Sequence, residues 1–342
     1  MKQRLSNIEL LRIISIFLIL VFHANYRTFS PPTFLELREE PIVYGLQIFT
    51  EQLSVICVNI FIIISGWFGI HFSMKKLWQF IYQCLFFSFS IYFVLIIFGL
   101  KSFNTSEAIK TIFYLTPYNW FVKSYIILMI LSPALNLLVE KYEKTKYLII
   151  ILFIIQTFYG INGYAADFNN GYSAISFISI YLTARYLKTR PIKLMRKGSM
   201  FNLFIYIGIV LLCTILPMIL CFANKNNLYT AIININISYI NPLVIIEAFA
   251  LFFCFNNIKI KPSKIINRIA ASSYAVYLFH AHTSFFDSYF SGFLKSLILP
   301  PLQFSIITFT FLCVIFIVGI LTDQVRLATW NLIDKKWLTT KE

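Results

Sequence analysis

The chain has 342 residues, of which 59% are hydrophobic and 13% charged, and its mean hydropathy is +0.76. This profile excludes a soluble globular protein and indicates an all-α, polytopic membrane protein. The net charge of +15 does not predict a nucleic-acid partner, because Lys and Arg in membrane-protein loops set orientation. The six cysteines form no CxxC pair and have no zinc spacing, so no metal site is predicted.

Apolar runs close to the length that crosses a bilayer, about 20 residues, recur along the chain. We expect about ten transmembrane helices, at 8–26, 47–70, 77–100, 117–139, 147–162, 172–187, 201–222, 239–255, 269–288 and 298–321. The first run lacks a small-residue cleavage site and is followed by further spans. We therefore interpret it as a retained helix rather than a signal peptide.

The distribution of basic residues predicts the orientation. With ten spans, 21 of the 29 Lys and Arg residues fall on the side that holds both termini, and seven fall on the other side. The positive-inside rule then makes both termini cytoplasmic, in a multi-pass protein of the plasma or inner membrane. The short tail 322–342 is too small to fold alone, so residues 1–342 are interpreted as one membrane domain, with membrane lipid as a partner.

The first apolar run carries two basic side chains, Arg12 and His23. Eleven residues place them on one face of a helix, about 16 Å apart along its axis. Charges within a span are costly, which favours a functional role. The alternative for Arg12 is an ion pair with Glu9 and a side chain that extends to the headgroups. His23 could by itself be an interfacial histidine.

Other ionisable residues also fall within the predicted spans, and each is a functional candidate. Glu247 lies near the middle of its span, where a buried Asn or Tyr could instead satisfy it. His280 and Asp287 share a helix face but lie about 10 Å apart in height, so they could line a cavity without touching. The remaining polar candidates are Glu51, His282, Asn59, Asn119 and Asn136.

Four stretches follow one another in an order that is characteristic of one family. They are NIELLRIISIFLILVFH (7–23), VNIFIIISGWFGI (58–70), NWFVKSYIILMILSPALN (119–136) and ASSYAVYLFHAH (271–282). The first contains an Arg, ten intervening residues and a His. Together these stretches resemble the membrane acyltransferase 3 family, in the stand-alone form without an esterase-like domain. The resemblance is carried by Asn7, Arg12, His23, Ser65, Gly66, Trp67, Trp120, Phe121, Tyr125, Pro133, Asn136, Tyr277, Leu278 and His280.

The resemblance implies transfer of an acyl group, commonly acetyl, from cytoplasmic acyl-CoA to a hydroxyl of a surface glycan. It implies that His23 acts as general base or acyl carrier and that Arg12 contacts the donor. In the cytoplasmic loop where the family often has arginines, this chain has Lys75 and Lys76, which act as point charges. Without an esterase-like domain, the transfer would finish within the membrane domain.

These considerations predict a set of site residues. His23, Arg12 and Glu51 are the catalytic candidates, with Glu51 orienting the His23 ring. Arg12, Lys75 and Lys76 are expected to bind acyl-CoA, which would be acetyl-CoA. The acceptor, a cell-surface polysaccharide or lipid-linked oligosaccharide, is expected to contact Asn119, Trp120, Glu247 and His280. The outer loops 162–172 and 222–239 have the aromatic and amide composition found around sugars, although loops of an aromatic-rich membrane protein share it by default.

Two other functions would also use a polar site in the membrane. A transporter or flippase of lipid-linked glycans predicts repeated halves or broken helices, which the sequence does not display, and an exporter without acyl chemistry is related to it. A glycan polymerase predicts a large outer loop with several arginines. The longest candidate, 27–46, has only Arg27 and Arg38 among three glutamates.

Overall fold

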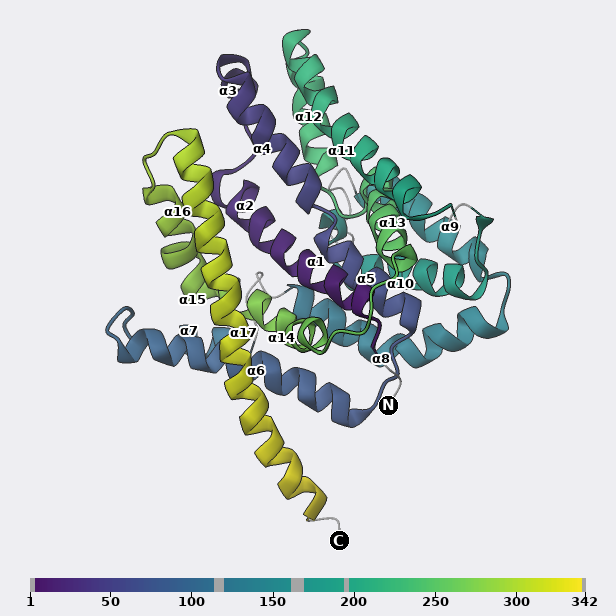
Figure 1. The fold of residues 1–342 in the computed structure, drawn as a ribbon, viewed down its shortest axis with the longest axis vertical. Helices are drawn as coiled ribbons and strands as arrows, with labels where there is room; N and C mark the ends of the chain where they lie inside the picture. The colour runs from purple at the N-terminus through teal and green to yellow at the C-terminus, as the bar shows by residue number, and fades with distance from the viewer. Residues whose placement is uncertain (1–3, 114–119, 161–168, 194–196, 340–342) are drawn as a thin grey trace. The chain divides into compact units, whose positions relative to one another are not determined.

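The computed structural model describes residues 4–113, 120–160, 169–193 and 197–339, and every regular element in these ranges is a helix (Figure 1). The all-α prediction is confirmed for this part of the chain. The chain divides into two compact units. Unit 1 comprises Met1–His71 and Lys123–Ser263, and unit 2 comprises Phe72–Val122 and Lys264–Glu342.

Six helical segments in the described ranges are long and apolar enough to cross a membrane: Ser6–Phe29, Pro41–Phe68, Met74–Ile97, Trp120–Lys141, Ser199–Phe222 and Pro301–Asp334. Shorter helices lie at the other four predicted positions, namely α9 (Thr145–Ile155), α10 (Ala174–Thr189), α13 (Pro242–Asn257) and α14 (Lys264–His280). A multi-pass membrane protein is therefore supported. The count of ten spans and the cytoplasmic location of the termini stay predictions.

Unit 1 is organised around α5 (Cys57–Phe68), which packs against α1 (Ser6–Ala24), α10 and α13. Gly66 allows this packing, because a Cβ there would lie 2.5 Å from the Tyr181 carbonyl oxygen on α10. α11 (Ser199–Phe222) packs against α13 and α4 (Pro41–Ser54), while α8 (Trp120–Lys141) begins in unit 2 and continues in unit 1. The helices therefore surround α5 closely.

A small apolar cluster in unit 1 joins α2 (Tyr26–Phe29), α3 (Phe34–Glu39) and α12 (Asn226–Asn236) to α4 and α11. We call this cluster the cap; its buried residues are Tyr26, Leu37, Ile48, Cys221, Tyr229 and Ile233. The Tyr229 hydroxyl donates a 2.7 Å hydrogen bond to the Pro32 carbonyl. Segments that the sequence assigned to two separate outer loops thus share one core.

Unit 2 contains α6 (Met74–Ile97), α7 (Thr105–Ile112), α14, α15 (Thr283–Phe285), the π-helical η5 (Phe286–Ser291), α16 (Gly292–Ser296) and α17 (Pro301–Thr339). α14 packs against α17 and α6. Arg326, which falls in the tail predicted at 322–342, is 3% exposed within α17. Its guanidinium donates to Asp323 at 2.8 and 2.9 Å, because a buried charge needs a partner.

Candidate active site

α1 is one uninterrupted helix from Ser6 to Ala24, so it holds Arg12 and His23 on a rigid element about 16 Å apart. Near its start, the Asn7 side chain donates 3.0 Å hydrogen bonds to the carbonyls of Phe255 and Ile258, where α13 ends. We call this region of unit 1 the Arg12 end. The region around the last turn of α1 is called the His23 end.

The His23 ring lies where the backbone leaves the helix. Asn25 has φ −94° and ψ −106°, which ends α1 and redirects the chain into α2. This turn brings Arg27 Nη1 to 3.3 Å from His23 Nε2. The Thr28 hydroxyl donates a 2.7 Å hydrogen bond to the His23 carbonyl and holds the turn. His23 is 7% exposed.

Glu51 on α4 is fully buried and is tied to the same turn. The Asn25 side-chain amide donates to Glu51 Oε2 at 3.0 Å and to the Gln47 carbonyl at 2.9 Å. Glu51 Oε1 has no hydrogen-bond partner in the described part of the chain. The structure therefore places Glu51 beside the last turn of α1, linked to it through Asn25. Its direct action on the His23 ring stays a prediction.

Aromatic rings surround the His23 end. Phe22 lies 5.8 Å from the His23 ring and 6.1 Å from Tyr239, and Tyr172 lies 5.0 Å from Tyr239. The two tyrosine hydroxyls also share a hydrogen bond. The Tyr239 amide donates to the carbonyl of Asn170 in η3 (Asn169–Gly171). Both predicted sugar-contact loops thus reach this end through their last residues, whereas 162–168 lie outside the described residues.

At the Arg12 end, the guanidinium lies 3.5 Å from Glu9 Oε1, and its side chain is 34% exposed. The ion pair is the one that the alternative for Arg12 anticipated. On the neighbouring helix α5, Trp67 contacts the Phe252 and Phe253 rings of α13 at 5.2 and 5.6 Å. Lys188 Nζ lies 4.7 Å from the centre of the Trp67 ring, so a second cation lies at this end.

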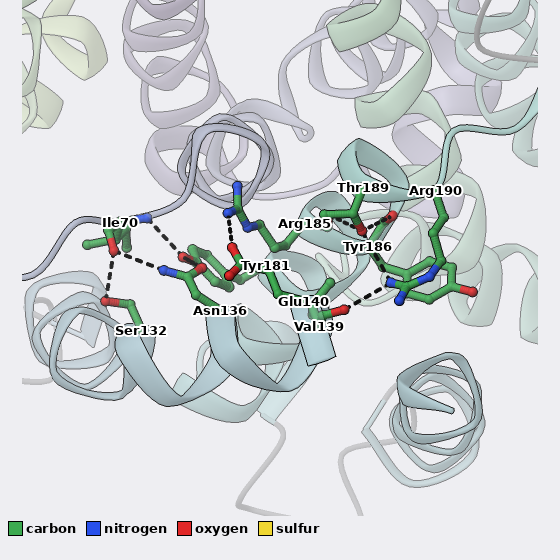
Figure 2. A network of polar contacts seen from close by, with 10 residues as sticks. All are labelled: Ile70, Ser132, Asn136, Val139, Glu140, Tyr181, Arg185, Tyr186, Thr189 and Arg190. Atoms are coloured by element: carbon green, nitrogen blue, oxygen red, sulfur yellow. Dashed lines mark hydrogen bonds and ion pairs between the residues drawn. The ribbon is translucent and has the colours of Figure 1, made fainter. Parts of the chain in front are cut away.

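A hydrogen-bond network holds the chain that leaves α5 (Figure 2). The Ile70 amide donates to the Tyr181 hydroxyl at 2.9 Å, and Asn136 Nδ2 donates to the Ile70 carbonyl at 3.1 Å. Tyr181 in turn donates to Asn136 Oδ1 at 2.8 Å, while Ser65 and Tyr125 lie 3.2 Å apart. Two stretches that resembled the family, 58–70 and 119–136, therefore meet in space at this point.

Arg185 on α10 lies against the same segment. It forms an ion pair with Glu140, while its Nε is buried without a hydrogen-bond partner among the described residues (Figure 2). Gly69, with φ +72°, leaves the space for it, because a Cβ there would lie 3.0 Å from Arg185 Nη1. Arg190 donates to the Val139 carbonyl at 2.9 Å. The last turns of α10 thus add cations where helix C-termini favour positive charge.

Glu247 is fully buried in α13, in unit 1. Neither of its carboxyl oxygens has a hydrogen-bond partner in the ranges that the structure describes. Burying a carboxyl group without a partner is costly, so Glu247 stays a candidate for a functional residue. Its role in acceptor binding stays a prediction.

Four of the predicted site residues that the structure describes belong to unit 2. Lys75 forms a 2.8 Å ion pair with Asp334, and Lys76 lies in the first turn of α6. Trp120 contacts the Phe121 ring at 5.9 Å. His280 is fully buried, and its Nδ1 lies 2.6 Å from the Val276 carbonyl, which can only accept a hydrogen bond from it. Asn119 lies outside the described residues.

The sequence reasoning missed three residues that lie at the two ends. Arg27 was counted as an outer-loop cation, although its spacing of four from His23 was a local signal. No motif or spacing in the sequence indicated that Asn25 contacts Glu51, or that Arg185 lies against Gly69. Among the described residues, no three His, Cys, Asp or Glu side chains lie close enough together to hold a metal ion.

Comparisons with known proteins show to which family the chain belongs. No curated protein and no solved structure matches the chain. The model of the acyltransferase 3 family, described as an acyltransferase domain, matches residues 5–321 and so includes most of both units. It contains the motif residues at the Arg12 end as well as Arg12 and His23. The chain belongs to the acyltransferase 3 family.

Proposed function

We propose that the protein is an integral membrane O-acetyltransferase that moves an acetyl group from cytoplasmic acetyl-CoA to a hydroxyl of a cell-surface or lipid-linked polysaccharide. The observation that carries the proposal is the arrangement on α1, within a family of acyltransferases. One rigid helix joins a cation-rich end to a buried histidine about 16 Å away, a distance comparable with an extended pantetheine arm.

The Arg12 end has the chemistry to bind the donor. Coenzyme A carries several phosphates and an adenine ring, which favour guanidinium, ammonium and aromatic groups. Arg12, Arg185 and Lys188 supply the charges and Trp67 supplies an aromatic ring. Lys75 and Lys76 stay candidates for the same role, although Lys75 already has Asp334 as a partner.

His23 is the residue that would activate the acceptor. Its Nε2 would take the proton of the acceptor hydroxyl while that oxygen forms a bond to the thioester carbonyl carbon. The carbon–sulfur bond then breaks, and Nε2 returns the proton to the leaving thiolate. In the acyl-carrier variant, Nε2 itself attacks the thioester and displaces the CoA thiolate. The hydroxyl then attacks the acyl-histidine, which releases the imidazole, and the hydroxyl proton goes to the thiolate. A buried, water-poor position favours either route by limiting hydrolysis.

The His23 end also offers hydrogen-bond acceptors to a sugar. Glu51 Oε1 and Gln52 Oε1 are buried and lack partners in the described part of the chain. Because orphaned acceptor oxygens require donors, the hydroxyl groups of a glycan would complement them. Tyr172 and Tyr239 add aromatic surface beside His23. Glu247, Trp120, Asn119 and His280 stay the acceptor contacts that the sequence predicts.

The orientation follows from charge. In the ten-span arrangement, the side that holds both termini also holds most of the basic residues, which supports a cytoplasmic location for the termini and for the start of α1. The donor would then be bound from the cytoplasm, and the acceptor at the opposite face of the cell membrane. The two transfer partners would thus approach α1 from opposite sides.

The test is direct. Purified protein in lipid nanodiscs would be incubated with acetyl-CoA carrying a labelled acetyl group and with cell-envelope glycan, and we expect labelled glycan and free CoA. His23→Ala is the matched control and should give neither. Glycan moved across the bilayer of a proteoliposome without CoA release would contradict the proposal and favour the transporter alternative.

A further inference from the structure

Arg27 faces His23 from the first turn after α1. Its Nη1 lies 3.3 Å from Nε2, although the two residues belong to different helices. The approach depends on the break at Asn25, and Thr28 stabilises that break by donating to the His23 carbonyl at 2.7 Å. The turn at Asn25 and the Thr28 hydrogen bond thus set where the guanidinium lies relative to the ring.

A guanidinium group has five N–H donors and no acceptor. A hydrogen bond between Arg27 and Nε2 therefore requires the Nε2 lone pair, and the ring proton then lies on Nδ1. A ring protonated on both nitrogens would place two donors and two positive charges against each other. This contact is compatible only with one protonation state of His23 and with one of its two tautomers.

We infer that Arg27 is a positioning residue for His23, which holds the imidazole neutral with Nε2 unprotonated so that this nitrogen is ready to accept a proton. The inference rests on the proposed function for its catalytic meaning. The acceptor hydroxyl would replace Arg27 as the donor at Nε2. The displaced guanidinium would remain beside the thioester carbonyl oxygen, which gains negative charge as the new bond forms.

Other titratable groups face this region from the neighbouring elements. Glu51 on α4 approaches through Asn25, and Tyr26 belongs to α2. Tyr172 lies just before α10, and Tyr239 lies between α12 and α13. The contact of Arg27 with the His23 ring is defined by the 3.3 Å distance between Nη1 and Nε2, so removal of Arg27 tests the inference directly.

The test measures the tautomer and does not depend on turnover. The chain has four histidines, so ¹⁵N-histidine labelling in nanodiscs gives few signals, and His23→Gln identifies the His23 pair. We expect a protonated Nδ1 and an unprotonated Nε2 in the wild type. Arg27→Met should move the ring toward the Nε2–H form, and Arg27→Lys should restore the wild-type pattern in part. His280, held by Val276, should not change in any variant.

Kinetics provide the second readout. Arg27→Met should lower kcat about tenfold and leave the KM for acetyl-CoA unchanged, because general-base efficiency depends on the state of the base. Arg38→Met is the matched control, since Arg38 is a cation of α3 that donates a hydrogen bond to the Asn224 side chain. An Nε2–H tautomer in the wild type, or an unchanged tautomer in Arg27→Met, would overturn the inference. A wild type without transferase activity would instead overturn the proposed function.

Discussion

The two ends of α1, both within unit 1, differ in how their charged and titratable side chains are buried and paired. At the Arg12 end, cations lie in partly exposed ion pairs with Glu9 and Glu140, and the backbone around Ile70 is held by neutral side chains. At the His23 end, the buried Glu51 carboxyl group accepts a hydrogen bond from Asn25, and the buried His23 imidazole lies beside Arg27. The first arrangement suits reversible binding of an anionic ligand. The second suits proton transfer away from water.

The contrast between the two ends of α1 predicts the largest effect for a substitution of His23. His23→Ala should lower the rate of CoA release on the order of 10²- to 10⁴-fold, the range that a general base supplies. Thermal unfolding in detergent should stay close to the wild type, because the α1 backbone is anchored through Asn7. A variant that retains more than a tenth of wild-type turnover would remove His23 from the chemistry.

The Arg12 end should respond in donor binding instead. Arg185→Gln should raise the KM for acetyl-CoA about tenfold or more, since a hydrogen bond to a charged group contributes about 1.5–3 kcal/mol. The kcat should change little. Lys144→Gln removes an exposed cation of the neighbouring loop and serves as control. If both variants bind the donor equally well, Arg185 does not contact the donor and serves only as the ion-pair partner of Glu140.

The close contact of α5 with α10 supports the Arg12 end and gives a prediction on stability. Gly66→Ala should lower the free energy of unfolding by about 1–3 kcal/mol, because its Cβ would meet the Tyr181 oxygen and the Ala184 Cβ at 2.5 and 2.9 Å. Gly208→Ala is the control, with no atom within 4 Å of the new Cβ. Equal melting temperatures of the two variants would mean that α10 can move away from α5.

The cap, near the His23 end, should show the smallest effect. Thr33 and Glu36 form a reciprocal capping box on α3, with hydrogen bonds of 2.7, 2.8 and 3.3 Å. Donation by the Thr33 amide and then its hydroxyl lowers the pKa of the Glu36 carboxyl. The Glu36 carboxylate therefore stabilises α3 fully at pH values above the ordinary pKa of a carboxyl group. This stabilisation is lost as the pH falls through the lowered pKa of Glu36.

Thr33→Ala should accordingly cost about 1 kcal/mol of local stability at neutral pH. Hydrogen exchange of the α3 amides measures this loss, and the difference from the wild type should shrink in acid. Thr230→Ala, at an exposed threonine of α12, is the control. A difference that stays constant with pH would show that the Glu36 side chain does not take part in the capping box.

Part of this architecture follows from local sequence. Each of the ten predicted segments overlaps a helix, and the Arg12–His23 spacing on one helix is confirmed, because apolar runs and helical periodicity are local properties. The Glu9–Arg12 ion pair was also anticipated. The grouping of Lys75, Lys76, Trp120 and His280 in unit 2 was not, because it depends on how the helices pack.

The sequence alone determined the helices, the membrane environment and the placement of Arg12 and His23 on one face, since these depend on hydrophobicity and on a repeat of 3.6 residues. Only the tertiary structure decided which polar groups meet. Arg185 reaches Gly69 across 116 positions of sequence, and Asn25 reaches Glu51 across 26, through contacts between helices. Such contacts depend on close packing, where a single Cβ at Gly66 would change the approach of two helices.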